Sequence, residues 1–368
     1  MLAGNDIRVV EADTFSAARF WDERVDRRLL MTSCGLRHLA AAAFSPLPTL
    51  RSLGLADNRR LPRDDLVAAV RRVDTLTKLD VSAGSAFRHT FDLAELFRHP
   101  HSAAGLRLEK LVTAENGIRT ISANLSTAAA IATMRSLDLS SNEMTTLAGG
   151  LSLFRRLERL SVKENRLTRI DSGALTGLQR LTSVDLSYNR LEELDGEVLR
   201  PLTRLRYLNL AGNRLRTLSA DAVPSGIEYL SVRGNRLVSV PFLASLAHLS
   251  SVDVSANGLQ RLDAHQFSQH IRSSISANFS RRARPEHSHR EIAPELSVTV
   301  SRTVPRPTSR PMRSWTVTSG LGQLLAQRDF VDRRSGVLRR RIQRPGRGRE
   351  PAYAFDAVRG AGRRRTAS

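Results

Sequence analysis

The sequence predicts an α/β solenoid, in which about ten short coils stack so that their parallel strands form one concave sheet. Three observations lead to this fold class. A pattern of the form LxxLxLxxNxL recurs along most of the 368 residues. Aromatic residues make up only 5% of a chain that is 41% hydrophobic, so the core must come mainly from Leu, Val and Ile. Beyond residue 280 the pattern stops, and a stretch rich in Arg and Pro predicts a disordered basic tail.

The repeat is clearest in the middle of the chain. Six segments match in full, beginning at residues 134, 157, 181, 205, 227 and 249, with LTSVDLSYNRL and LRYLNLAGNRL as examples. The segment that begins at residue 108 also fits, and those at 26, 50 and 76 fit more loosely. Successive positions of the Asn column lie 22 to 32 residues apart. Such self-similarity at a nearly constant period indicates stacked repeats.

The alternating leucines of each unit predict a short strand with one buried face, as for Leu208 and Leu210. One strand cannot bury that face alone, whereas strands stacked about 4.8 Å apart close a shared core. The Asn turns the chain out of the strand, and its amide can bond backbone groups that would otherwise be unpaired. We therefore predict a ladder formed by Asn58, Asn116, Asn142, Asn165, Asn189, Asn213, Asn235 and Asn257.

Two positions of this column depart from the pattern. Cys34, the single cysteine, is small and forms weak hydrogen bonds, so we expect it to replace Asn tolerably. A lone cysteine also excludes an intramolecular disulfide. Gly84 has no side chain to contribute, so the third unit is expected to be the loosest of the stack.

These motifs resemble the leucine-rich repeat family over roughly residues 26–267. Units near 24 residues, with an apolar residue such as Leu175 or Val223 about ten positions after the Asn, look like its typical class. That class is common in receptor ectodomains and adhesion proteins, including Toll-like receptors. The resemblance implies a horseshoe-shaped, non-catalytic module that binds a protein ligand or a receptor subunit on its concave strand face.

We divide the chain into an N-terminal cap or degenerate repeat (1–25), a leucine-rich-repeat domain (26–280) and a disordered tail (281–368). Segments 7–15 and 271–280 are interpreted as degenerate end units. The tail holds 21 Arg and 7 acidic residues, and so carries +14 of the formal net charge of +21. Three interpretations of the tail are open. It is a solvated linker without an evolved function, an electrostatic arm for nucleic acid, acidic protein or anionic lipid, or a nuclear-import signal around residues 333–344.

Residues that carry chemistry are not grouped in any recognisable way. We find no nucleophile–base pair, no phosphate-binding loop and no metal-ligand spacing, so the sequence predicts no enzyme, cofactor, metal or small-molecule substrate. His287 and His289 lie in the tail without companion ligands. Two N-glycosylation sequons, at Asn124 and Asn278, are about as many as chance would produce.

The outward-facing strand residues predict the binding surface. Three of the four tyrosines, Tyr188, Tyr207 and Tyr229, are expected close together on it. Tyr offers a large rigid contact area with a polar tip, although it is also common in strands for its β propensity. Nearby residues are expected to orient the partner: Arg159, Lys163, Asp185, Asn209, Arg233 and Asp253. A further row follows the ladder asparagines and is interpreted as a solvated edge: Arg166, Arg190, Arg214 and Arg236.

Localisation is the least constrained property. The N-terminus has Asp6, Arg8 and Glu11 where a signal peptide needs an apolar run, and no stretch is long and apolar enough to span a membrane. A receptor or adhesion ectodomain, extracellular or at the cell surface, is expected if the chain is a fragment. The alternatives are a cytoplasmic scaffold or regulatory subunit with a basic arm, and a nucleic-acid-associated protein that binds through its tail.

Overall fold

The computed structural model describes residues 2–16, 27–92, 96–97, 106–122, 132–147, 149–259, 274–278 and 297–301, the last two segments by their backbone alone. All of them belong to one compact unit, Met1–Ser319. The disordered tail that the sequence predicts falls almost entirely outside these residues, as do Asn124, His287 and His289.

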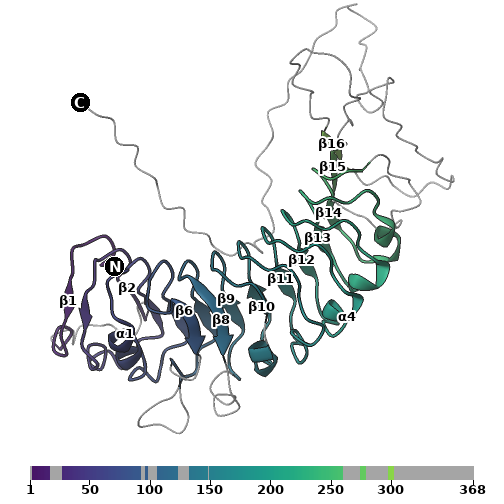
Figure 1. The fold of residues 1–368 in the computed structure, drawn as a ribbon. Helices are drawn as coiled ribbons and strands as arrows, with labels where there is room; N and C mark the ends of the chain where they lie inside the picture. The colour runs from purple at the N-terminus through teal and green to yellow at the C-terminus, as the bar shows by residue number, and fades with distance from the viewer. Residues whose placement is uncertain are drawn as a thin grey trace, which may run out of the picture. The chain divides into compact units, whose positions relative to one another are not determined.

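The predicted solenoid with a parallel sheet is confirmed. Twelve strands form one sheet, and each pairs with the next along the stack (Figure 1). The pairing is parallel from β2 to β15 and antiparallel between β15 and β16. In order, the strands are β2 (Arg28–Leu30), β4 (Ser52–Gly54), β5 (Lys78–Asp80), β7 (Lys110–Val112), β9 (Ser136–Asp138), β10 (Arg159–Ser161), β11 (Ser183–Asp185), β12 (Tyr207–Asn209), β13 (Tyr229–Ser231), β14 (Ser251–Asp253), β15 (Ser274–Asn278) and β16 (Ser297–Ser301).

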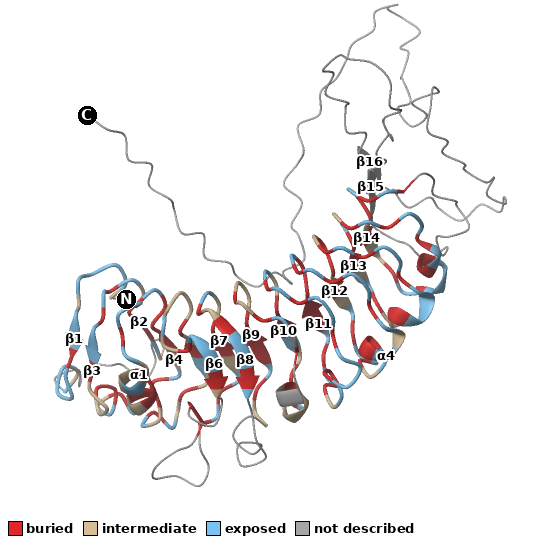
Figure 2. Cartoon of the chain, in the orientation of Figure 1, coloured by how far each residue is buried: buried red, intermediate tan, exposed pale blue. Residues whose placement is uncertain are grey.

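The register of the sheet follows the repeat without slippage from β2 to β14. Tyr207 pairs with Tyr229 across β12 and β13, and the leucines that follow them pair in turn. Because the side-chain period of a strand is two, this register keeps every middle residue on the inner face. Those residues, from Leu29 in β2 to Val252 in β14, are at most 3% exposed, and they belong to one continuous core (Figure 2).

The chain returns from each strand through irregular segments and short helical turns. These include the α-helices α1 (Arg63–Val70) and α4 (Gly196–Leu199), and the 3-10 turns η2 (Gly149–Leu153), η3 (Ala220–Ala222) and η4 (Pro241–Ser245). Two small parallel pairs supplement the main sheet. One joins β1 (Val9–Val10) to β3 (His38–Leu39), and the other joins β6 (His89–Asp92) to β8 (Ile118–Ser122).

The ladder asparagines are buried, and each of them joins two coils. Asn58 shows the pattern: its Nδ2 donates to the carbonyls of Met31 in the preceding coil and Leu55 in its own. Its Oδ1 accepts from the backbone N–H groups of Cys34 and Leu36. Every side chain therefore satisfies backbone groups of the coil before it, which would otherwise be buried without partners. Equivalent bonds follow at Asn142, Asn165, Asn189, Asn213, Asn235 and Asn257.

The two irregular positions of the column behave differently. The Sγ atom of Cys34 lies 3.1 Å from the carbonyl oxygen of Leu2, in the place of an asparagine Nδ2 donor. Gly84 offers nothing to its neighbours, and the Oδ1 atom of Asn116, which faces it, is buried without a hydrogen-bond partner in the described part of the chain. Asn5, which our alignment did not include, occupies the same column one coil earlier, and its Nδ2 donates to Leu2.

Candidate functional site

The outward side of the sheet carries three rows of side chains, which we call the sheet face. The first row consists of the first residue of each strand and the second row of the third residue. The third row lies two residues further on, where backbone hydrogen bonds such as Val162 N to Asp185 O still continue the ladder of the sheet. Because side chains alternate along a strand, all three rows point away from the core.

An aromatic pair occupies the first row of β12 and β13. The rings of Tyr207 and Tyr229 stack with centroids 4.6 Å apart and planes inclined by 5°. Both side chains are half-buried, and the residues on either side of them in the row are the small Ser183 and Ser251. The pair therefore stands between short neighbours as a preformed apolar surface whose conformation the sheet register determines.

The Oγ atom of Ser183, beside Tyr207, is buried and has no hydrogen-bond partner in the part of the chain that the structure describes. A hydroxyl without a partner is costly inside a protein. It is a polar group at the base of the Tyr pair that sequence reasoning did not single out.

Asp185 lies in the second row beneath the aromatic pair and is only 9% exposed. One carboxylate oxygen accepts from the backbone N–H of Ser187 at 2.9 Å and from its hydroxyl at 2.6 Å. The other accepts from the amide of Asn209 at 3.3 Å. Burial raises the pKa of Asp185 despite these bonds. Burial and the nearby Asp185 charge also hold the pKa of the Tyr207 hydroxyl well above its ordinary value, so it stays neutral.

The acidic residues of the second row are bonded within their own strands and turns. Asp253 accepts from the backbone N–H of Ser255 at 3.0 Å, and Asp185 is bonded likewise to Ser187. Arg233, in the third row, is exposed and donates to the hydroxyl of Ser255 at 3.0 Å. The Asp row thus lies lower and is more firmly held than a set of free orienting charges, while Arg233 keeps most of its surface accessible.

Tyr188 lies at the edge of the sheet face, directly before the ladder residue Asn189. Its φ is 54°, in the left-handed region that favours glycine, and it is 56% exposed. The Nζ atom of Lys163 lies 5.6 Å from the ring centroid, and the same ammonium lies 3.1 Å from the Glu164 carboxylate. On its other side the ring lies over Gly212, where a Cβ would be 2.7 Å from Cδ1 of Tyr188.

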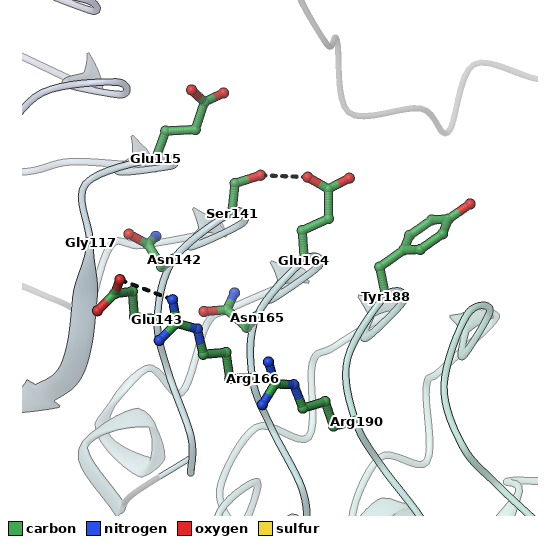
Figure 3. A pocket seen from close by; sticks show the side chains of 10 residues that line it. All are labelled: Glu115, Gly117, Ser141, Asn142, Glu143, Glu164, Asn165, Arg166, Tyr188 and Arg190. Carbon is green, nitrogen blue, oxygen red and sulfur yellow. Dashed lines mark hydrogen bonds and ion pairs between the residues drawn. The ribbon is translucent and has the colours of Figure 1, made fainter.

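Tyr188 also closes one end of an open groove of about 590 Å³ along this edge (Figure 3). Its upper wall holds Glu164, which accepts from the Ser141 hydroxyl at 2.8 Å. Its lower wall holds Arg166 and Arg190, which extend in the same direction, and Arg166 bonds Glu143 at 3.1 Å. The row predicted as a solvated edge therefore includes one guanidinium with a carboxylate partner. A hydrogen bond from Arg119, with the charge of Arg166, holds the pKa of Glu143 below its ordinary value.

The remaining predicted residues are placed as follows. Arg159 is exposed in the first row of β10, and Ser183 separates it from Tyr207 by one strand. Asn278 lies in β15, where the backbone alone is described. The structure thus brings Tyr207, Tyr229, Asp185 and Asn209 together, and sets Tyr188 with Lys163 apart at the edge.

Sequence reasoning omitted Lys78 and Lys110 from the site. They stand in the first row of β5 and β7 and pair with each other across the two strands. The strand alignment contained both of them, but attention to tyrosine drew the prediction toward β11–β14.

Two wider searches give negative results within the described ranges. No group of three or more His, Cys, Asp or Glu side chains there could hold a metal ion. Within those ranges no helix has the length and apolar character needed to cross a membrane.

Comparisons with known proteins agree with the geometry. A sequence model described as leucine rich repeat matches residues 155–215. Among solved structures, a Toll-like receptor 13 complex with single-stranded RNA aligns with a TM-score of 0.52 and 17% identity, over 69% of this chain and 43% of that one. An internalin from Listeria monocytogenes aligns with a TM-score of 0.49 and 22% identity, over 64% of this chain and 62% of that one. A comparison with curated proteins gives no match.

The fold and the repeated strand-and-asparagine unit define a solenoid repeat protein. The chain belongs to the leucine-rich repeat family, as its motifs indicate and the match at residues 155–215 shows. It spans less than two thirds of the length of either solved structure, and at these identities the likeness concerns the fold alone.

Proposed function

We propose that this chain is a non-catalytic protein-binding module whose partner docks on the sheet face around Tyr207 and Tyr229. The observation that carries the proposal is the stacked pair itself, with its 4.6 Å centroid separation and its small neighbours on both sides. Tyr residues in a fixed conformation lose little entropy on binding and are enriched among the residues that dominate interface energy.

The surroundings of the pair suit a protein partner. Arg159 and Arg233 are exposed on opposite sides of it and supply charge that can steer and orient an acidic surface. Asp185, Asn209 and Asp253 are held by hydrogen bonds, so they give the rim a defined polar shape. Lys163 and Tyr188 extend the contact area toward the edge. A rigid strand scaffold then presents the aromatic centre and the polar rim together.

The experiment compares Tyr207→Ala and Tyr229→Ala with Val238→Ala in the full-length chain. Val238 is an apolar residue, 64% exposed, that lies outside the three rows of the sheet face, so it is a matched truncation control. Proteins captured by the wild-type chain are identified first, and their affinities for each variant are then measured. We expect each Tyr variant to weaken binding by more than about 1 kcal/mol, with thermal stability nearly unchanged. Unchanged affinity in both would refute the proposal.

The finer role that we propose is that of a receptor or adhesion ectodomain, or a fragment of one, at the cell surface. The repeat class, with units near 24 residues, supports this role over the cytoplasmic scaffold. Detection of the chain on intact cells of its source, compared with permeabilised cells, decides between the two. Binding of nucleic acid through the tail rests on residues outside the described ranges and stays a prediction. Salt-sensitive binding that disappears when 281–368 are deleted would support it.

A further inference from the structure

Lysine is distributed unevenly in this chain. Arginine outnumbers lysine by 54 to 3, yet Lys78, Lys110 and Lys163 all stand in the rows of the sheet face. Only six basic residues occupy those rows, and half of them are lysine, whereas none of the other 51 basic residues is. A bias that made almost every basic position arginine has therefore spared this one surface. Lysine differs from arginine by presenting a compact point charge on a flexible stem.

Four of the six cations lie in the first row, and we call them the cationic row: Arg28, Lys78, Lys110 and Arg159, on β2, β5, β7 and β10. Lys78 and Lys110 are directly opposite each other on neighbouring strands, about 4.8 Å apart along the sheet. Like charges in this arrangement destabilise a sheet. Neither lysine forms an ion pair with any residue in the described ranges. An anion from outside the chain would relieve this repulsion.

The nearby carboxylates do not neutralise the cationic row. Asp80 and Asp138, in the second row, each accept from the hydroxyl of the serine two residues further along, at 2.6 Å. Their oxygens are thus engaged on the side away from the first row. The face therefore carries a line of unpaired cations beside a line of fixed carboxylates, roughly 6.6 Å away along the strands.

We propose that the cationic row binds an acidic polypeptide segment, which lies extended across β2 to β10 with its carboxylates over Lys78 and Lys110. This inference rests on the proposed function, since it names the chemistry of the partner that also contacts the Tyr pair. The row spans five strand spacings, about 24 Å, which matches seven or eight extended residues. Tyr207 and Tyr229 continue the same row beyond Arg159 and Ser183, so one partner can reach both parts.

The paired rows favour a polypeptide over a nucleic acid. A nucleic acid carries a negative phosphate at every residue, so its backbone would meet the Asp row as well as the cations. The side chains of an extended peptide alternate, so carboxylates can face the lysines while neutral or hydroxyl groups face Asp80 and Asp138. Arginine, which recognises phosphate with a planar fork, is also the residue that this part of the face replaces with lysine.

Lysine reactivity tests the proposal in the full-length chain, because the tail, 281–368, contains no lysine and cannot contribute to the signal. The probe is a synthetic eight-residue peptide with glutamate at alternate positions. A single-stranded oligonucleotide of equal charge serves as the comparison. The rate of acylation is measured at each lysine by mass spectrometry. We expect the peptide to slow Lys78 and Lys110 about threefold at low salt, and not at high salt, as for exposed ion pairs.

Lys163 is the internal reference, because Glu164 already holds its ammonium at 3.1 Å. Slowing of Lys78 and Lys110 by the peptide, with little change at Lys163 or with the oligonucleotide, supports the proposal. No slowing at either lysine overturns it. Equal slowing by the oligonucleotide also overturns it and assigns the row to nucleic acid.

A charge-matched pair of double variants gives a second test. Lys78→Gln with Lys110→Gln, and Arg216→Gln with Arg236→Gln, each remove two positive charges, but Arg216 and Arg236 lie outside the sheet face and are exposed. We expect the lysine variant alone to bind the glutamate peptide about threefold more weakly. Equal weakening in both would reduce the effect to net charge and overturn the inference.

The natural partner separates this inference from the proposed function. If the Tyr variants lose the partner while the double lysine variant binds it normally, the acidic segment is excluded and the proposed function stands. If the lysine variant loses the partner while both Tyr variants retain it, the Tyr-centred function fails and the cationic row stands.

Discussion

Tyr188 occupies a backbone conformation that every coil imposes. The residue before the ladder position has a positive φ throughout the stack, and neighbouring coils meet that demand with Gly212 and Gly234. A tyrosine there is strained, since a side chain with a Cβ is crowded in the left-handed region. Its ring is mostly exposed and rests on Gly212, so packing does little to offset the strain. The position favours contact with something outside the chain.

Gly212 should therefore be coupled energetically to Tyr188. We expect Gly212→Ala to lower the free energy of unfolding by about 2 kcal/mol, because the new Cβ meets both a positive φ and the tyrosine ring. In a Tyr188→Gly background only the φ cost remains, and the loss should fall to about 1 kcal/mol. Urea denaturation of the four proteins of this cycle measures the coupling. Equal losses in both backgrounds would show that the ring does not lie over Gly212.

Asp185 gives the site a pH dependence whose sign follows from burial. Its pKa is raised in the folded chain, so the folded state binds the proton more tightly than the unfolded state does. The stabilisation that this provides is complete below the ordinary value of 3.8 and is lost as the pH rises through the raised pKa. At neutral pH the buried charge therefore costs stability.

Asp185→Asn should raise the free energy of unfolding at pH 7, by about 1 kcal/mol, and leave it unchanged near pH 3. Asn209, in the same row of the next coil, already makes the equivalent bond to Ala211 N at 3.1 Å, so an amide fits this position. Unfolding free energies at the two pH values provide the measurement. A destabilised variant at pH 7 would mean that the attraction to Lys163 outweighs burial.

At the scale of the element, the asparagine ladder explains why coils of different length share one register. Each amide bonds backbone groups of two coils, so a strand is held at its exit by its successor as well as by the sheet. The first coil shows the consequence of losing half of that chemistry. Cys34 supplies a donor to Leu2, but a thiol has no counterpart to the amide oxygen that elsewhere accepts two N–H groups.

We expect Cys34→Asn to stabilise the chain by about 1 kcal/mol, because its Oδ1 would accept from the N–H groups of residues 5 and 7 while its Nδ2 keeps the bond to Leu2. Cys34→Ala, which provides neither group, serves as the comparison and should destabilise the first coil. Thermal unfolding followed by circular dichroism measures both. A lower melting temperature for the asparagine variant would show that the first coil lacks room for the amide.

At the scale of the whole molecule, a solenoid is stable through contacts between neighbouring coils, so local defects remain local. The coil of Gly84 lacks a ladder side chain, and Asn116 beside it has an amide oxygen without a partner in the described ranges. We expect hydrogen exchange measured by mass spectrometry to be about tenfold faster there than in β10 to β13, which corresponds to roughly 1.4 kcal/mol. Uniform exchange along the stack would contradict this expectation.

The sequence by itself determined the coils, the first strand residue of ten strands, the buried leucine columns and the asparagine column. These features repeat at short range, so each unit of about 24 residues states them again. The same alignment predicted that Tyr207 and Tyr229 would be adjacent, because register alone decides it.

Only the tertiary structure decided how the outward side chains are used. Asp80, Asp138 and Asp185 are bonded to serines, Tyr188 lies over Gly212 at the edge, and Lys78 and Lys110 stand unpaired by any described carboxylate. These outcomes depend on which side chains meet across coils 20 to 30 residues apart in sequence, and on burial. A repeat pattern specifies that such positions face outward, but it cannot specify the contacts that charge, size and backbone conformation select there.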